Sequence, residues 1–349
     1  MLSAIADLRR CGAGGGAFGG RPEICGWKDP RVGSRHSGAL ETPCDHNMTL
    51  VKGGGEASKP VLVTGATGFV GRALGVGLDA AGIGWIGASR AGGFDLEDAA
   101  IGARLPDCRI LIHLAGRAGV PESWDQPAAY HRTNTLTTLA ALEHARACGA
   151  GFVLMSSYMY GVPQRLPIDE THPVDCRNPY AHSKHHSELL CHAYAQDFGV
   201  PVTILRPFNI FGPGQGTNQV IPHILAQALD EPVIRVNDLA PRRDYLWIGD
   251  LVDALLRVIS APTHVSGRGP AVYNLGSGVS HSVAEIVDAV VSLVGPRRIV
   301  CADTARLNEI PDCVCDASRF RQAFNWQPMT DLPVGLRLML DHAGNGPMR

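Results

Sequence analysis

Two side chains placed four residues apart could together move a proton. Tyr180 and Lys184 follow Asn178-Pro179, a pair typical of a helix start, so both should project from one face of a helix. Tyrosine has a pKa of about 10 and acts as a base near neutral pH only where a cation stabilises its phenolate. Lys184 is the only lysine after residue 59, and a compact ammonium suits this task better than a guanidinium. The spacing therefore favours acid–base catalysis by Tyr180 with help from Lys184.

A serine closes an apolar run of strand length at 152–156. Ser156 would lie at the carboxyl end of its strand, where α/β sheets bind ligands, and could donate to a substrate oxygen while Tyr180 exchanges the proton. The predicted catalytic set is Ser156, Tyr180 and Lys184. His182 and His186 on the same helix have a metal-site spacing, but no acidic partner motif follows, so we expect no metal.

A glycine-rich turn follows the first apolar run. Residues 64–71 have the sequence Thr-Gly-Ala-Thr-Gly-Phe-Val-Gly, with glycines at every third position between a strand and a helix. A side chain at the first or second glycine would block the approach of a diphosphate, and the helix N-terminus offers free N–H groups and a partial positive charge. This context predicts a dinucleotide site with contacts from Gly65, Thr67, Gly68, Phe69, Val70 and Gly71.

The end of the second apolar run bears on the choice of cofactor. A carboxylate at this point binds the ribose 2′-hydroxyl of NAD and repels the 2′-phosphate of NADP. Here the run ends at Ser89-Arg90 without an acid, and these two residues could hold a phosphate. Arg90 could equally be a solvated loop residue, so NAD and NADP both stay open. Asp95 and Leu96 fall where the adenine would lie.

These residues belong to an alternation of apolar runs and helical segments that begins at Lys59. Strands are predicted at 61–64, 85–88, 109–114, 152–156, 202–206 and 272–275, and helices at 70–81, 127–147, 179–198, 250–260 and 282–293. The alternation predicts an α/β fold, a Rossmann-type doubly wound parallel sheet with helices on both faces. We expect an NAD(P)-binding domain over 59–207. A smaller, more irregular and proline-rich substrate-binding region should follow over 208–349, interleaved with the last elements of the sheet.

Composition narrows the class of protein. The chain has 349 residues, a formal net charge of -2 and 18% charged residues, which gives no reason to expect a nucleic-acid or membrane-surface partner. No apolar run is long enough to span a bilayer, and the first 30 residues lack a secretory signal pattern. The ten cysteines include no C-x-x-C pair, as for reduced thiols, so a cytoplasmic location is expected. Residues 1–58, glycine-rich and without apolar periodicity, are predicted to be a disordered extension.

Together these motifs resemble the extended short-chain dehydrogenase/reductase family of nucleotide-sugar enzymes, over about residues 60–340. Further matching segments are His113-Leu114-Ala115-Gly116, similar to the family's fourth strand, Thr133-Asn134, Arg206-Pro207-Phe208-Asn209, Arg242-Arg243-Asp244-Tyr245, Tyr273-Asn274-Leu275-Gly276, and Arg306 with Glu309. The resemblance implies cofactor contacts from Leu114, Ala115, Gly116, Asn134, Tyr180, Lys184 and Pro207. It implies substrate contacts from Ser156, Asn209, Val220, Arg243 and Arg306, with the two arginines on a diphosphate.

The resemblance also implies the activity: an NAD(P)-dependent enzyme of nucleotide sugars that works as a homodimer. The C-terminal part is most similar to UDP-galactose 4-epimerases, so we expect a 4-epimerase that oxidises C4 transiently and returns the hydride. The missing acid after the second strand is more typical of NADPH-dependent 4-keto-sugar reductases, which are the alternative. The family's 4,6-dehydratases carry an Asp-Glu pair where this chain has Ser157 and Tyr158, which disfavours dehydration. A cofactor-binding regulator without turnover is the alternative of another class, and the intact serine, tyrosine and lysine argue against it.

Overall fold

The computed structural model describes residues 59–98, 101, 104–261, 269–304 and 309–344. The chain divides into two compact units, Met1–Asn47 and Met48–Arg349. The extension predicted over residues 1–58 lies outside the described residues, and the fold below belongs to the second unit.

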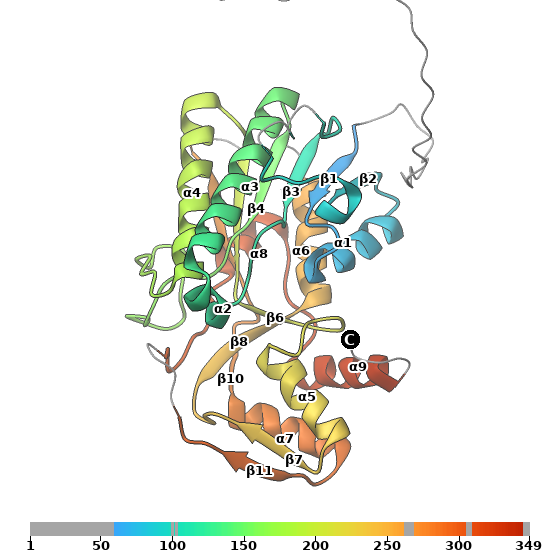
Figure 1. Ribbon diagram of the computed structural model, residues 1–349, viewed down its shortest axis with the longest axis vertical. Coiled ribbons are helices and arrows are strands. Elements are labelled where there is room, and N and C mark those ends of the chain that lie inside the picture. Colours follow the sequence, from blue (N-terminus) through green and yellow to red (C-terminus); the bar gives the residue numbers. More distant parts are fainter. Residues whose placement is uncertain (1–58, 99–100, 102–103, 262–268, 305–308, 345–349) are drawn as a thin grey trace, which may run out of the picture. The chain divides into compact units, whose positions relative to one another are not determined.

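Six parallel strands form the central sheet in the order β2-β1-β3-β4-β5-β9 (Figure 1). They are β1 Val61–Thr64, β2 Trp85–Ala88, β3 Ile110–His113, β4 Gly151–Met155, β5 Val202–Pro207 and β9 Ala271–Leu275. Each predicted strand is found within one residue of its expected ends, and the doubly wound parallel sheet is confirmed. One detail differs from the prediction. The segment His113–Gly116 was compared with the family's fourth strand, but it begins at the end of β3, the third strand along this chain. The crossover from β2 back past β1 to β3 makes the carboxyl ends of β1 and β3 the switch point, where such sheets bind ligands.

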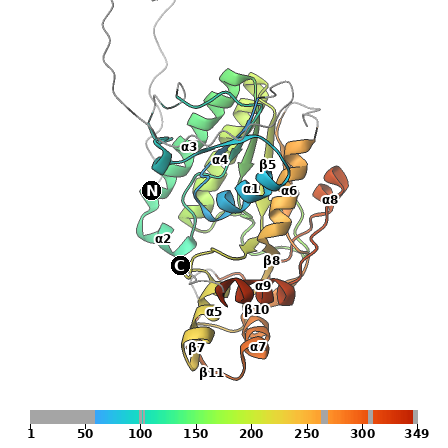
Figure 2. The ribbon, with the colours of Figure 1, turned by 90° about the vertical axis from the view of Figure 1, so that its right-hand side faces the viewer.

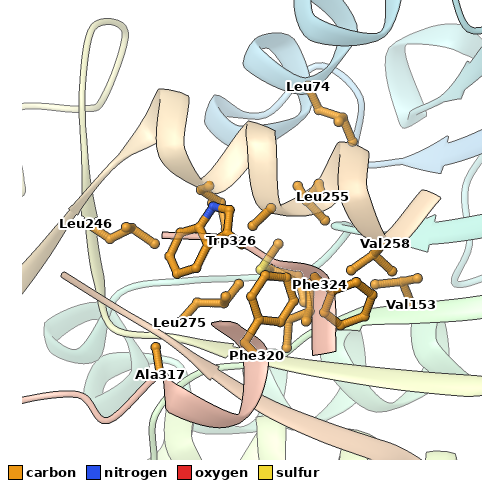
Figure 3. Packing of buried hydrophobic residues seen from close by; sticks show 14 of the residues in the cluster. Leu74, Val153, Leu246, Leu255, Val258, Leu275, Ala317, Phe320, Phe324 and Trp326 are labelled. Atoms are coloured by element: carbon orange, nitrogen blue, oxygen red, sulfur yellow. The ribbon is translucent and has the colours of Figure 1, made fainter. Parts of the chain in front are cut away.

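Helices cover both faces of this sheet, with α1 and α6 in front of it and α3 and α4 behind it in Figure 2. Their bounds are α1 Phe69–Ala80, α3 Pro127–Cys148, α4 Pro179–Phe198 and α6 Ile248–Ser260. Leu74 of α1 and Leu255 of α6 pack in one buried cluster, which Phe320 of α8 (Ser318–Phe324) extends (Figure 3). Leu142 of α3 belongs to the cluster on the other face. Among the described helices, none is both long and apolar enough to cross a membrane.

The segment after Phe208 was expected to be irregular, yet it contains defined short elements. They are β6 Asn209–Phe211, α5 Val220–Asp230, β7 Val233–Val236, β8 Arg242–Trp247, β10 Ser280–Ser282, α7 Val283–Val294, β11 Arg298–Cys301 and α9 Leu332–Gly344. The strands pair as β10-β8-β6 and β11-β7, and the helices pack on a third buried cluster. Strands this short show no recognisable alternation in the sequence. Because α6 and β9 return to the central sheet from this segment, the two regions are interleaved.

A buried carboxylate holds β8 in place. Asp244 is fully buried, and its two oxygens accept four hydrogen bonds, from the backbone N–H and hydroxyl of Ser277 (both 2.7 Å) and the N–H groups of Gly278 (2.8 Å) and Cys315 (3.0 Å). A buried carboxylate is tolerated only when donors satisfy it in this way. The position of the neighbouring Arg243 on β8 is therefore fixed.

A buried ion pair joins α4 to β5. Arg206 donates from Nε and Nη2 to the two carboxylate oxygens of Glu188, at 2.9 and 2.5 Å, and both side chains are almost wholly buried. Ser156 donates to the same carboxylate at 2.5 Å. Arg206 Nη1 donates to the Tyr160 hydroxyl (3.0 Å), which donates in turn to Asn274 on β9 (2.6 Å). The pair thus links α4 to three strands, β4, β5 and β9, and its remaining polar atoms find partners, as a buried pair requires.

Removing one partner should leave a buried charge without compensation. We expect Glu188→Ala to lower the free energy of unfolding by about 3 to 5 kcal/mol, measured by chemical denaturation. The matched control is Glu231→Ala, because the pair of Glu231 with Arg235 is exposed and should contribute no more than about 1 kcal/mol. Equal stability of Glu188→Ala and wild type would show that the buried pair contributes nothing to folding.

Candidate active site

The glycine turn between β1 and α1 leaves no room for side chains. Gly65 has a φ of 68°, and a Cβ there would lie 2.7 Å from the backbone nitrogen of Ala115. A Cβ on Gly71 would lie 2.3 Å from the carbonyl oxygen of Gly65. α1 begins without a side-chain cap and without an acid in its first turn, so its N–H groups and positive end can receive an anion. The turn therefore fits the diphosphate of a dinucleotide.

Arg72, which the glycine motif does not include, joins this turn to the smaller region. Its Nη1 donates to the carbonyl oxygen of Thr67 at 2.5 Å, and its Nη2 donates to that of Gly214 at 3.3 Å. The guanidinium thus lies against the turn, where a positive charge favours a diphosphate. The only sequence signal for it was a basic residue directly after the last glycine of the motif.

The end of β2 presents a hydroxyl and a guanidinium. Ser89 accepts the N–H of Gly92 at 3.3 Å and so caps a short 3-10 turn, Arg90–Gly92. Arg90 is exposed, and its guanidinium makes no hydrogen bond or ion pair within the described part of the chain. At the predicted adenine end, Asp95 accepts the N–H of Glu97 at 3.1 Å, and Leu96 is buried. A carboxylate that would select NAD is absent from the end of β2 itself.

The loop after β3 is fixed by Asn134 of α3. The Asn134 side chain is buried; its Oδ1 accepts the N–H of Arg117 at 2.7 Å and its Nδ2 donates to the Ser183 hydroxyl of α4 at 2.8 Å. Ala115 donates its N–H to the Thr64 hydroxyl at 3.4 Å. The predicted cofactor contacts Leu114, Ala115 and Gly116 therefore lie beside the glycine turn.

The start of α4 positions the predicted acid–base pair. Asn178 caps the helix by accepting the N–H of Ala181 at 2.8 Å, and Pro179 is its first residue. Tyr180 and Lys184 then follow one turn apart on one face. The ring of Tyr130, from α3, meets the Tyr180 ring edge-on, with centroids 6.2 Å apart. Tyr130 is a positioning contact that the sequence motifs did not reveal.

The two serines after β4 have different partners. Ser156 is buried and donates to Glu188, as described above. The Ser157 hydroxyl donates instead to the backbone carbonyl oxygen of Tyr158 at 3.4 Å, and it lies near enough to Tyr180 to lower the pKa of the phenol. The structure thus brings Ser157 to the tyrosine and turns Ser156 toward the buried ion pair. The predicted contact of Ser156 with a substrate oxygen stays a prediction.

The electrostatic setting keeps both members of the acid–base pair protonated near neutral pH. Burial raises the pKa of Tyr180, and the nearby Ser157 hydroxyl acts in the opposite direction. Lys184 is largely buried and, among the described residues, makes no hydrogen bond or ion pair. Burial lowers the pKa of Lys184 to about 8, against the raising effect of the Glu188 carboxylate. The site is therefore set to donate a proton.

The predicted substrate ligands lie on the neighbouring strands β6 and β8. Asn209 Oδ1 accepts the Tyr158 hydroxyl at 3.3 Å. Arg243 donates from Nη1 to the carbonyl oxygen of Ile310 at 2.6 Å, and its Nη2 pairs with the carboxylate of Glu309. A diphosphate on Arg243 would therefore compete with Glu309.

Three other predicted contacts have simpler outcomes. Val220 is the first residue of α5 and is half-buried, and Pro207 is the buried last residue of β5. Arg306 lies outside the described residues. At the positions of the dehydratase Asp-Glu pair, the Ser157 hydroxyl donates to the carbonyl oxygen of Tyr158, and the Tyr158 ring stacks on Phe208 with centroids 4.8 Å apart. Neither position offers the carboxylate that dehydration of this type needs.

Comparison with known proteins identifies the family. The profile of the NAD dependent epimerase/dehydratase family matches residues 61–276, and the chain belongs to this family. The GDP-6-deoxy-D-mannose reductase of Pseudomonas aeruginosa is 32% identical over 297 residues, which cover 80% of this chain and 95% of the relative. The UDP-glucose 4-epimerase of Mycolicibacterium smegmatis is 29% identical over 303 residues, which cover 79% and 95%.

Solved structures agree with this assignment. The structure of RMD from Pseudomonas aeruginosa complexed with NADPH has a TM-score of 0.73 and 32% identity, covering 83% of this chain and 100% of that one. The Thermus thermophilus UDP-glucose 4-epimerase complex with NAD has a TM-score of 0.71 and 26% identity, covering 81% and 98%. The homologues are NAD(P)-dependent enzymes of nucleotide sugars, and this chain is an enzyme of the same family.

The lowered pKa of Lys184 can be measured directly, because the chain has only four lysines, at 28, 52, 59 and 184. In protein labelled with 13C at lysine Cε, we expect one NMR signal to titrate with a midpoint of about 8 and to be missing from Lys184→Met. Since the folded-state pKa lies below the ordinary value of 10.5, the contribution of Lys184 to stability should increase as the pH rises from about 8 to about 10.5. A spectrum without a signal that titrates near pH 8 would contradict this description of the site.

Proposed function

We propose that this enzyme moves a hydride between NADP(H) and C4 of a nucleotide-bound hexose, and that its net reaction is the reduction of a nucleotide-linked 4-keto sugar. The observation that carries the proposal is the end of β2, where Ser89 and the exposed Arg90 stand in place of a carboxylate. A guanidinium favours the 2′-phosphate of NADP, whereas NAD selection normally uses an acid.

One further observation supports reduction. A relative whose solved structure is complexed with NADPH is 32% identical to this chain. Burial raises the pKa of Tyr180, which suits donation of a proton to a carbonyl oxygen, a step that both a reductase and an epimerase contain. The sequence alone favoured a 4-epimerase over a 4-keto-sugar reductase, and the proposal reverses that order.

The residues divide the work as follows. The bound dinucleotide supplies the hydride. Tyr180 gives its phenolic proton to the C4 oxygen, and the Ser157 hydroxyl, which lies near Tyr180, donates to the charge that develops there. The Lys184 ammonium, one helical turn away, stabilises the phenolate that remains. Arg243, Arg306 and Asn209 bind the nucleotide diphosphate, and Arg72 holds the cofactor turn against the segment that carries Gly214.

A 4-epimerase is the second candidate function. The matches in the C-terminal part and the relatedness to a UDP-glucose 4-epimerase favour it. The same tyrosine, lysine and serine would first remove the 4-OH proton and then return it after the sugar has turned over. The two candidates differ in the fate of the cofactor, because an epimerase retains it and a reductase must exchange it in each cycle.

The catalytic roles predict an asymmetric response to mutation. Tyr180→Phe should lower turnover by roughly 10² to 10⁴-fold while cofactor binding persists. Ser157→Ala should lower kcat by about 10² to 10³-fold, because it removes the hydroxyl proposed to stabilise the charge on the C4 oxygen beside Tyr180. Its matched control is Ser156→Ala, which should instead reduce stability by about 1 to 3 kcal/mol with little change in kcat. Steady-state kinetics and chemical denaturation separate the two effects. Loss of turnover in Ser156→Ala with normal turnover in Ser157→Ala would reverse the assignment.

Cofactor use separates the two candidate functions. With a nucleotide-linked 4-keto-6-deoxyhexose, a reductase should consume NADPH in proportion to product, and nicotinamide absorbance should fall. With UDP-glucose, an epimerase should form the 4-epimer with no net change in absorbance.

Ser89→Asp should weaken NADPH binding and leave NADH binding unchanged, since a carboxylate repels a 2′-phosphate. Unchanged NADPH affinity in this variant would remove the main support for the reductase.

A further inference from the structure

The Tyr158 side chain connects the acid–base end of the candidate site to the predicted diphosphate ligands. It follows Ser157 directly in the chain, and its hydroxyl donates to Asn209 Oδ1 on β6 at 3.3 Å. Burial raises the pKa of Tyr158 well above its ordinary range, and the charge of Arg243 on β8 acts in the opposite direction, so the guanidinium lies near this hydroxyl. The roles given so far to Asn209 and Arg243 leave this tyrosine without one.

The Tyr158 ring has a fixed place. It stacks on the buried ring of Phe208, with centroids 4.8 Å apart and 18° between the ring planes. The backbone N–H of Tyr158 donates to the carbonyl oxygen of Pro207 at 3.3 Å, and its carbonyl oxygen accepts the Ser157 hydroxyl at 3.4 Å. Because contacts hold both the ring and the backbone, the hydroxyl stays directed at Asn209.

Two neighbours set the orientation of the Asn209 amide. An asparagine amide has an acceptor on one side and two donors on the other, and a half turn exchanges them. Nδ2 lies on the side of the Asp244 carbonyl oxygen, at 3.5 Å, and a carbonyl oxygen can only accept. A reversed amide would place Oδ1 against this oxygen. The hydroxyl of Tyr158 holds the other side, because it donates to Oδ1.

The orientation decides whether Asn209 can bind an anion. Nδ2 carries a second N–H, for which no partner is found among the described residues. A diphosphate oxygen needs such a donor, whereas a reversed amide would present an oxygen and repel it. The raised pKa of Tyr158 keeps its hydroxyl protonated, so the orientation does not change with pH around neutrality.

We propose that Tyr158 is a positioning residue for the nucleotide diphosphate, which it serves by holding the Asn209 amide with Nδ2 toward the phosphate oxygens. Tyr158 itself does not touch the reacting atoms, so its contribution is to substrate affinity and not to turnover. The inference rests on the proposed function in one respect, the placement of the diphosphate at Asn209 and Arg243.

The test measures binding of UDP and of GDP by calorimetry, with the full chain saturated with NADPH so that the dinucleotide site is occupied. Tyr158→Phe keeps the ring and removes the hydroxyl. It should raise the Kd of the nucleoside diphosphate and the KM of the nucleotide sugar by about 5- to 10-fold, with kcat and NADPH affinity unchanged. The matched control is Tyr273→Phe, a half-buried tyrosine of β9 whose ring contacts Phe320 and Phe324, and it should leave all four quantities unchanged.

A double-mutant cycle tests whether the tyrosine acts through the amide. Asn209→Ala should weaken diphosphate binding by roughly 10- to 100-fold, and adding Tyr158→Phe to it should have no further effect. Asn209→Asp still accepts from Tyr158 but has an anionic oxygen in place of Nδ2, so it should weaken binding at least as much as Asn209→Ala.

Several results would overturn the proposal. They are an unchanged Kd in Tyr158→Phe, a further loss when this change is added to Asn209→Ala, and normal diphosphate binding by Asn209→Asp. A fall of kcat or of NADPH affinity in Tyr158→Phe would also overturn it, because the effect would then reach beyond the diphosphate. UDP and GDP undergo no hydride transfer, so these results are independent of the choice between reductase and epimerase. Failure of the wild-type chain to bind either nucleotide would contradict the placement of the diphosphate in the proposed function, and the role of Tyr158 with it.

Discussion

The position of α4, which carries the predicted acid–base pair, depends on the buried pair formed by Glu188 and Arg206. The buried face of this helix is half polar, because Ser183, Lys184, Ser187 and Glu188 lie beside Ala181, Cys191, Tyr194 and Ala195. Apolar burial is therefore not the only interaction that sets how the helix packs on the sheet. A doubly hydrogen-bonded carboxylate and guanidinium have a narrow range of allowed geometries. Fixing Glu188 therefore also fixes Lys184 one turn earlier and Tyr180 two turns earlier.

The same pair determines which other groups are available for chemistry. The Glu188 carboxylate takes the Ser156 hydroxyl as an additional donor, and Ser157, the next hydroxyl along the chain, lies near Tyr180 and lowers its pKa. Because Arg206 neutralises Glu188 at close range, Lys184 is left without an ion-pair partner in the described structure. An ammonium in that position is free to act on the tyrosine, whereas a lysine paired with Glu188 would be held away from it.

The sequence predicted the parts of this arrangement that follow from local pattern. Periodicity located the six strands of the sheet, and the glycine spacing located the cofactor turn. It assigned the serine role to Ser156, and it could not show that the distant Glu188 carboxylate accepts this hydroxyl, because that contact exists only in the folded chain. Short elements such as β6 gave no detectable alternation, and residues such as Arg72 acquire a role only through contacts with distant segments.

The ion pair of Arg243 with Glu309 has a consequence for turnover. If Arg243 binds the diphosphate, the substrate must replace Glu309 as the anionic partner of the guanidinium. The net binding free energy is then smaller, because the existing ion pair has to be broken. Departure is assisted for the same reason, because Glu309 restores the contact as the product leaves. The pair would thereby lower the affinity for the substrate and speed product release, which suits the proposed reduction, in which substrate and cofactor must both be exchanged in every cycle.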